Sequence, residues 1–254
     1  MSAEQPPGWP LGVGRISHAE IDSTNAEAFR IAAGFSGPVW IIAGMQTEGR
    51  GRRARPWVSP RGNFHATLVM QPQETADVVA LRSFVAALAL RDALVAVTGL
   101  RDGVALKWPN DVLLNGGKVA GILLESARLG SPAAVLCIGI GVNLIAAPDA
   151  ALLEAGAVPP VSLLAETGVR VSPEAFLAAL APAYARWEAV FADQGFAPVR
   201  VAWLAQAARL GEVIHARTGT TRQTGVFDGI DARGNLILRT ADGAVAIPAA
   251  EVFF

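Results

Sequence analysis

The chain has 254 residues, of which 52% are hydrophobic and 17% are charged, and its formal net charge is −1. This composition is typical of a globular protein with a sizeable core and excludes a disordered or fibrous chain. A net charge near zero creates no global field that would attract nucleic acid or an anionic membrane, so any anion site must be local.

No segment of the sequence predicts export or a membrane span. The start, MSAEQPPGWP, lacks the basic and apolar regions of a signal peptide. The longest apolar stretches, 84–97 and 133–147, contain charged or polar residues and are shorter than the ~20 residues that cross a bilayer. The single cysteine, Cys137, cannot form an internal disulfide. We therefore expect a cytoplasmic protein.

The first part of the chain predicts alternating strands and helices. Strands are expected near residues 13–21, 38–45 and 63–70. A helix near 24–33 has a start that fits a capping box, with Thr24 at the N-cap and Glu27 three residues later. Residues 74–98 place apolar side chains at helical spacing and predict the main helix, which Gly99 ends.

Three β segments and two helices are expected next. The β segments are 104–108, 111–125 with a turn at Gly116 and Gly117, and 134–144. Ser172 as N-cap and Pro173 in the first turn predict a long helix to about Phe191. A short helix is expected at 198–208.

The residue pattern of the sequence changes at Gly211. Short strands separated by Gly, Asp and Asn turns are expected at 211–218, 225–230, 235–240 and 244–247. This rhythm predicts a small β-barrel beside a larger α+β domain. We place the domains at 1–208 and 209–254.

The segment GRGRRARPW, residues 49–57, is the most informative one. Its four arginines, Arg50, Arg52, Arg53 and Arg55, repel one another unless an anion lies among them. Planar guanidinium groups suit phosphate oxygens, and the glycines let backbone N–H groups approach the same anion. A solvated basic loop is the alternative. The spacing does not match G-x-x-x-x-G-K-[ST], which argues against an NTPase of that class.

Two lysines begin or end predicted strands. Lys118 precedes an otherwise apolar run, so its ammonium group is expected to meet a partner or a cavity, or to extend to solvent. Lys107 precedes a turn that contains Asn110 and Asp111, a type of turn that is also common in purely structural settings.

Side chains alternate between the two faces of a strand, so Gly139, Gly141 and Asn143 share one face. Such a strip is either a floor for a flat ligand or a site of close helix–sheet packing. Cys137 is expected on the face opposite Gly139, among apolar neighbours that keep its thiol protonated, and it is a poor candidate for a nucleophile.

Taken in order, Ser-Thr-Asn at 23–25, Gln46 with GRGRRARPW, KWPNDV, GKVAGILLE and GIGVN resemble the motifs of biotin protein ligases. The likeness covers about residues 17–144, with a looser match over the C-terminal β segment. It implies an α+β fold: a mixed-sheet biotin/lipoyl-ligase-like catalytic domain followed by a small SH3-like β-barrel. It also implies activation of biotin by ATP to biotinyl-5'-AMP, and transfer to a lysine of the biotin carboxyl carrier protein of acetyl-CoA carboxylase or a related carboxylase.

The resemblance also assigns roles to residues. Lys118, Arg52 and Arg50 would be catalytic. Biotin would be bound by Ser23, Thr24, Asn25, Gln46, Arg50, Gly51, Arg52, Lys118, Gly121, Gly139 and Gly141. ATP would be bound by Arg53, Arg55, Trp57, Lys107, Asn110, Asp111 and Asn143. No residue is assigned with certainty to a metal, since Mg²⁺ would be carried mainly by the ATP phosphates.

The sequence departs from the family pattern in three respects. Ala54 stands where the third glycine of the basic loop is usual, and a positive φ there would cost ~1 kcal/mol. Larger relatives carry an N-terminal DNA-binding domain, whereas only a short segment precedes the first predicted strand, so no role in DNA binding is expected. The chain ends at Phe254, so contacts that longer relatives make from a tail are expected to be missing.

Two other functions compete with this hypothesis. A lipoyl or octanoyl transferase would share the fold, but the octanoyl class uses a cysteine thioester and Cys137 is poorly suited to it. A biotin or nucleotide sensor without turnover would not need so much phosphate-directed charge. The resemblance further implies a homodimer as one assembly of the chain.

Overall fold

The structure, a computed structural model, describes residues 6–128, 134–149, 157–219 and 221–254. Residues 1–5, part of the segment on which the expectation about a signal peptide rests, lie outside this range. Within the described ranges, no helix combines the length and the apolar character that a membrane span requires.

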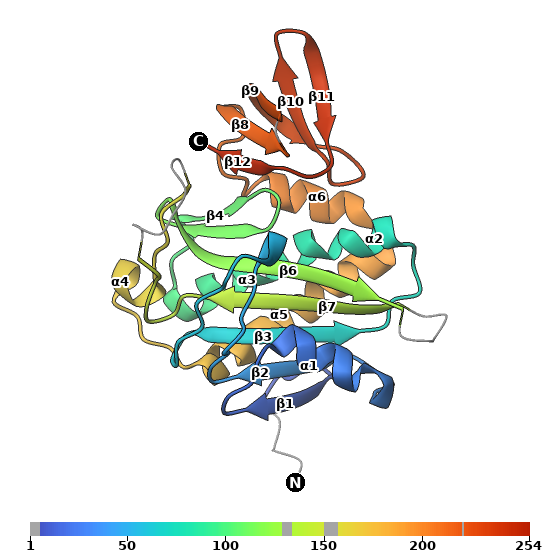
Figure 1. Cartoon of the computed structure of the whole chain (residues 1–254), viewed down its shortest axis with the longest axis vertical. Helices are drawn as coiled ribbons and strands as arrows, with labels where there is room; N and C mark the ends of the chain where they lie inside the picture. Colours follow the sequence, from blue (N-terminus) through green and yellow to red (C-terminus); the bar gives the residue numbers. More distant parts are fainter. Residues whose placement is uncertain (1–5, 129–133, 150–156, 220) are drawn as a thin grey trace.

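A seven-stranded mixed sheet forms the larger part of the molecule, with the order β1-β2-β3-β7-β6-β5-β4 (Figure 1). Strands β1 and β2 are parallel, and all other neighbours are antiparallel. The strands are β1 (Gly14–His18), β2 (Val39–Ala43), β3 (Phe64–Met70), β4 (Val104–Lys107), β5 (Asp111–Leu114), β6 (Gly117–Ala127) and β7 (Val135–Val142). The predicted α+β class with a mixed sheet is confirmed.

Helices cover the two faces of this sheet unequally (Figure 1). The main core lies between one face and the helices α3 (Arg82–Thr98), α5 (Pro173–Gln194) and α6 (Phe196–Leu204). The other face carries α1 (Thr24–Ile31), which packs on β2, β3 and β7 over a small apolar cluster that includes Cys137. Short helices α2 (Ala76–Ala80) and α4 (Leu163–Thr167) and the 3₁₀ turns η1 (Ala32–Gly34) and η2 (Arg52–Ala54) complete this part.

Several predicted boundaries are wrong by a few residues. The main helix expected at 74–98 is interrupted at Leu81, whose N–H bonds to the Val78 carbonyl in a tight turn between α2 and α3. The turn expected at Gly116 and Gly117 lies at Asn115 and Gly116 instead. Both of these residues have positive φ (50° and 83°), as a two-residue hairpin turn requires.

The predicted start of the long helix α5 is confirmed, because Ser172 Oγ accepts a hydrogen bond from the Ala175 N–H at 3.1 Å. This helix continues past Phe191 to Gln194, and α6 begins at Phe196 rather than at residue 198. Both shifts follow from Gly195, which ends α5 and begins α6 with φ 73°.

A second, antiparallel sheet of five strands lies beyond α6, with the order β11-β10-β9-β8-β12 (Figure 1). Its strands are β8 (Val213–Thr218), β9 (Thr221–Ile230), β10 (Leu236–Thr240), β11 (Gly243–Ile247) and β12 (Glu251–Phe253), of which β12 was not predicted. One buried and one partly buried hydrogen bond join this sheet to the larger part. Trp108 Nε1 donates to the Gly234 carbonyl at 3.0 Å, and Arg200 Nε donates to the Ile230 carbonyl at 2.6 Å.

Candidate functional site

A cavity of about 620 Å³ opens on the face of the large sheet that carries α1. Its walls are the start of α1, the hairpin 49–57, strands β6 and β7, the β4–β5 turn and the C-terminal strand β12. All the residues that the sequence assigned to biotin and ATP line this one cavity. Glu251, Val252 and Phe253 of the second sheet also line it, although the sequence did not point to them.

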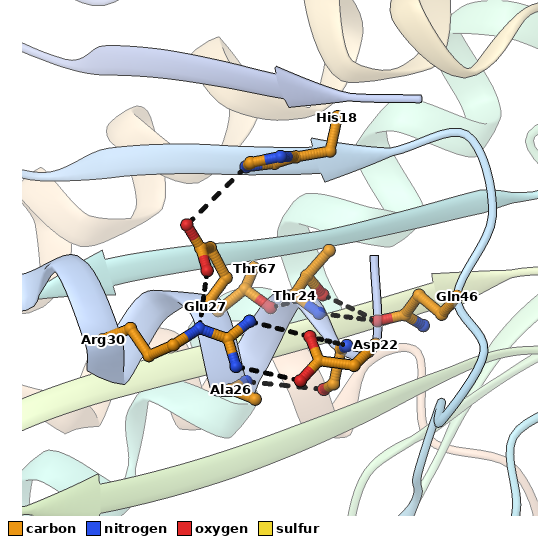
Figure 2. Close-up of polar contacts among 9 residues, drawn as sticks. His18, Asp22, Thr24, Ala26, Glu27, Arg30, Gln46 and Thr67 are labelled. Carbon is orange, nitrogen blue, oxygen red and sulfur yellow. Dashed lines mark hydrogen bonds and ion pairs between the residues drawn. The ribbon is translucent and has the colours of Figure 1, made fainter. Parts of the chain in front are cut away.

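The first turn of α1 forms one end of the cavity. Figure 2 shows the polar contacts around this turn, including those of Thr24 with Gln46 and of Glu27 with Arg30. The predicted capping box is wrong by one residue: the N-cap is Ser23, whose Oγ accepts from the Ala26 N–H at 3.4 Å. The hydroxyl of Thr24 is instead 3.0 Å from Gln46 Oε1. Glu27 does not close a capping box but pairs with Arg30 at 2.7 Å.

Hydrogen bonds orient the two amide side chains at this end. The Thr24 N–H donates to Gln46 Oε1 at 2.8 Å, and Gln46 Nε2 donates to Ser59 Oγ at 3.0 Å. The Thr67 hydroxyl lies 2.5 Å from Asn25 Oδ1 and 2.8 Å from Thr24 Oγ1. Since Asn25 Oδ1 can only accept, the Thr67 hydroxyl donates to it.

Thr67 and Glu125 belong to this network but were not selected from the sequence. Asn25 Nδ2 donates to Glu125 Oε2 at 2.7 Å, and the same carboxylate lies 3.3 Å from Arg50 Nη2. One signal was present: Glu125 has the same strand parity as Gly121, so both face the cavity side of β6. Thr67 carries no such signal, because only the strand register places it opposite Gly139.

The glycines of β6 and β7 are covered by protein side chains. A Cβ on Gly139 would lie 2.4 Å from Asn25 Oδ1, and a Cβ on Gly141 would lie 2.4 Å from the indole of Trp57. Gly121, the cross-strand partner of Gly141, also lies under the indole. Asn25 of helix α1 and Trp57 of the segment 49–57 are therefore the groups that need the space at Gly139 and Gly141, and these glycines also line the cavity.

Residues 49–57 form a small hairpin, hereafter the arginine hairpin. The Gly51 N–H donates to the Arg55 carbonyl at 2.8 Å, and the Trp57 N–H donates to the Gly49 carbonyl at 2.8 Å. At its tip, Arg53 and Ala54 both have φ 57°. Ala54 thus has the positive φ whose cost the sequence analysis weighed, and Arg53, the residue before Ala54, has a positive φ as well.

The sequence predicted that the four arginines repel one another unless an anion lies among them. The structure corrects this prediction, because side chains of the protein already pair with all four. Arg50 pairs with Glu125 at 3.3 Å, and Arg52 Nη1 donates to Asn110 Oδ1 at 3.2 Å. Both Arg53 and Arg55 pair with Glu251 of β12, at 3.0 Å and 2.6 Å. Carboxylates from two remote strands therefore offset much of the repulsion within the hairpin.

We predict that Ala54→Gly stabilises the closed arginine hairpin. A left-handed L-residue costs on the order of 1 kcal/mol, and glycine removes most of this cost while adding some freedom to the open form. Amide hydrogen exchange across 49–57 should slow about threefold. The control is Ala189→Gly in the exposed part of α5, which should lower the free energy of unfolding by ~1 kcal/mol. Faster exchange in Ala54→Gly would contradict a positive φ at this position.

Two lysines and one aspartate form the opposite end of the cavity. Lys118 Nζ lies 2.7 Å from Asp111 Oδ1 and 5.5 Å from the ring centroid of Trp57, and Lys107 Nζ lies 3.7 Å from Asp111 Oδ2. Burial opposes ionisation of Asp111, but the two ammonium groups hold its pKa below the ordinary value. Burial lowers the pKa of Lys107 despite the attraction of Asp111. The cluster thus combines two basic side chains with one carboxylate.

Asn110 and Asn143 are held by the backbone of neighbouring segments. Asn110 Nδ2 donates to the Ile122 carbonyl at 2.5 Å, which leaves its Oδ1 to accept from Arg52. Asn143 is 2% exposed, and its Nδ2 donates to the Val161 carbonyl at 3.1 Å. Asn110 thus positions the arginine hairpin, whereas the amide of Asn143 ties the end of β7 to the segment before α4.

The described residues contain no group of three or more His, Cys, Asp or Glu side chains that could hold a metal ion. The carboxylates of Asp111, Asp149 and Glu251 line the cavity, and those of Asp111 and Glu251 are paired with cationic side chains. These side chains do not supply a ligand set for Mg²⁺, so no chemical step is assigned to a protein-bound metal.

Cys137 lies on the same face of β7 as Gly139, and its expected place on the opposite face is wrong. Residues two apart in a strand share a face, and Cys137 packs in the cluster under α1 while Ile138 points into the main core. Burial, with a contribution from Glu125, raises the pKa of the Cys137 thiol to about 12.

We predict that Cys137 of the native protein does not react with a thiol-directed disulfide reagent at pH 8. Because the thiol pKa is about 12, raising the pH to 9 produces little thiolate and should leave the rate near background. The same protein in denaturant is the control and should react completely. Rapid labelling of the native protein at neutral pH would show that the thiol is accessible and ionised.

Comparison with known proteins identifies the class to which this fold and cavity belong. Residues 19–143 match the biotin/lipoate A/B protein ligase family, and residues 210–254 match the biotin protein ligase C terminal domain. The chain is 60% identical over 236 residues to a biotin–[acetyl-CoA-carboxylase] ligase of Paracoccus denitrificans, covering 93% of this chain and 98% of that protein. The chain therefore belongs to the biotin protein ligase family.

More distant relatives agree with this assignment. The bifunctional ligase/repressor BirA of Escherichia coli is 29% identical over 228 residues, which cover 89% of this chain and 68% of that protein. A solved biotin protein ligase from Aquifex aeolicus, in complex with biotin and ATP, superposes with a TM-score of 0.79 at 25% identity and covers 94% of this chain and 97% of that one.

Proposed function

We propose that this protein is an ATP-dependent ligase that converts biotin to biotinyl-5'-AMP and transfers the biotinyl group to a lysine of the carrier protein of acetyl-CoA carboxylase. The observation that carries the proposal is one continuous cavity with a neutral, amide-lined end at α1 and a cationic end at Lys118 and the arginine hairpin. The likeness to the Paracoccus denitrificans ligase supports biotin as the acid.

The neutral end suits the head group of biotin. Gln46 uses one N–H of its amide to bond Ser59, and Asn25 uses one N–H of its amide to bond Glu125. Each amide therefore keeps a second N–H for a ligand carbonyl. Ser23, at the start of α1, lines the same wall. The apolar strand segments between the two ends match the hydrocarbon chain of biotin. The indole of Trp57, which the resemblance assigned to ATP, covers Gly121 and Gly141 in the same region.

In the first step, a carboxylate oxygen of biotin attacks the α-phosphorus of ATP. The bond between this phosphorus and the oxygen bridging to the β-phosphate breaks, and pyrophosphate leaves. Little proton transfer is needed, so positioning and charge neutralisation supply most of the rate. Lys118 would lie beside the carboxylate and the α-phosphate, and together with Arg50 and Arg52 of the hairpin it would provide the neutralising charge. Mg²⁺ would arrive on the ATP phosphates.

In the second step, the neutral ε-amine of the acceptor lysine attacks the acyl carbon of the mixed anhydride. The C–O bond to AMP breaks, the amine loses a proton, and an amide forms. Between the two steps the hairpin would cover the anhydride and exclude water, since hydrolysis would waste the activated acid. We assign this catalytic role to residues 1–208 and the supporting sheet to residues 209–254.

Mass spectrometry of a carrier domain incubated with the protein, ATP, Mg²⁺ and biotin tests the proposal. A mass increase equal to one biotinyl group on one lysine is expected. Reactions without ATP, with octanoate or lipoate in place of biotin, and with the acceptor lysine replaced by arginine are the controls. Modification with octanoate or lipoate but not with biotin would favour the lipoyl-transferase alternative. Tight binding of biotin without biotin-dependent ATP–pyrophosphate exchange would favour a sensor.

A further inference from the structure

We propose that Glu251, on the last strand of the C-terminal sheet, is a positioning residue that holds the tip of the arginine hairpin closed over the acyl-adenylate. This inference rests on the proposed function only where it concerns the adenylate. The hairpin and β12 are far apart in the sequence, and both line the same cavity.

The contacts of Glu251 are concentrated on the hairpin tip. Its Oε2 lies 3.0 Å from Arg53 Nη1, and its Oε1 lies 2.6 Å from Arg55 Nη2. A third arginine, Arg217, faces Glu251 across the β8–β12 ladder and also pairs with Oε2. The carboxylate is 15% exposed, whereas Arg53 and Arg55 are 44% and 57% exposed. A nearly buried, fixed carboxylate thus holds two otherwise exposed side chains.

The conformation of the tip explains why an external partner is needed. Arg53 and Ala54 adopt consecutive left-handed conformations, which L-residues disfavour. Glu251 pairs with Arg53 and Arg55, the residues directly before and after Ala54, so its carboxylate holds the chain on both sides of this residue. Ion pairs to the second sheet therefore oppose the tendency of this turn to relax into an open loop.

Hydrogen exchange of residues 49–57 in the unliganded protein measures this role directly. Glu251→Gln is expected to accelerate exchange about fivefold, since it removes two ion pairs from the tip. The matched control is Glu212→Gln, which removes an exposed pair with Arg209 elsewhere in the C-terminal part and should leave the hairpin unchanged. Adding Ala54→Gly to Glu251→Gln should slow exchange again by about threefold, because it relieves the strained turn.

A functional readout separates positioning from a general loss of stability. Glu251→Gln should release biotinyl-AMP about fivefold faster than the wild type, and Ala54→Gly should partly restore retention. If the glutamine variant melts at a lower temperature, Glu251→Asp keeps the charge but shortens its reach and should show the same faster exchange without the loss of folding.

The proposal is overturned if hairpin exchange in both Glu251 variants equals that of the wild type, or if Ala54→Gly does not slow exchange in Glu251→Gln. Tighter ATP binding with unchanged exchange would also overturn it, because Glu251 would then be an anion that competes with the nucleotide. A wild-type protein that forms no biotinyl-AMP would instead reject the proposed function, while the exchange data would still decide the role of Glu251.

Discussion

Replacement of Lys118 by alanine is expected to reduce biotin-dependent ATP–pyrophosphate exchange by about 10²- to 10³-fold, the usual loss when a preorganised charge is removed from a reacting centre. Lys118 and Lys107 are the only lysines in the chain. Lys107 is 8% exposed and burial lowers its pKa, so we do not expect it to replace Lys118. Loss of Lys118 also leaves Asp111 without its partner at 2.7 Å.

The double variant Lys118→Ala/Asp111→Asn separates these two effects. Without Lys118, the carboxylate of Asp111 repels both the biotin carboxylate and the phosphates. Replacing it by an amide should therefore recover ATP binding but leave pyrophosphate exchange slow. Arg186→Ala, which removes an exposed cation of α5, is the control and should retain wild-type exchange. Near-normal exchange in Lys118→Ala would remove Lys118 from the first step.

Arg52→Gly is expected to leave adenylate formation partly intact but to accelerate release of biotinyl-AMP by about tenfold or more. Arg52 Nη1 donates to Asn110 Oδ1 at 3.2 Å, and this bond ties the arginine hairpin to the turn between β4 and β5. Without it, the strained tip at Arg53 and Ala54 loses one of the contacts that hold it closed. The adenylate that stays with the protein after rapid filtration measures the effect.

Two variants distinguish the side chain of Arg52 from added backbone freedom. Arg52→Ala removes the guanidinium without the flexibility of glycine and should release the adenylate nearly as fast as Arg52→Gly. Arg61→Gly, at an exposed arginine beyond the hairpin, should retain the adenylate like the wild type. If Arg52→Gly retains biotinyl-AMP as tightly as the wild type does, the shielding role of the hairpin is wrong.

Local patterns predicted much of the fold because they depend on neighbours in the chain. Strand parity correctly placed Gly139 and Gly141 on one face of β7. The cap of α5 was likewise predicted, since it needs only Ser172 and the residues that follow it. The cap of α1 was not, because Ser23 and Thr24 can both cap a helix. Bonds from Thr24 to Gln46 and Thr67 decide between them.

The sequence by itself determined which functional groups the cavity contains, because its motifs supply the amide, arginine and lysine side chains that line it. Only the tertiary structure decided how these groups are held. The carboxylates of Glu125 and Glu251 reach the arginine hairpin because β6 and β12 pack beside it. Electrostatic energy depends on distance in space, so the charge of a nine-residue motif cannot reveal partners that come from remote strands.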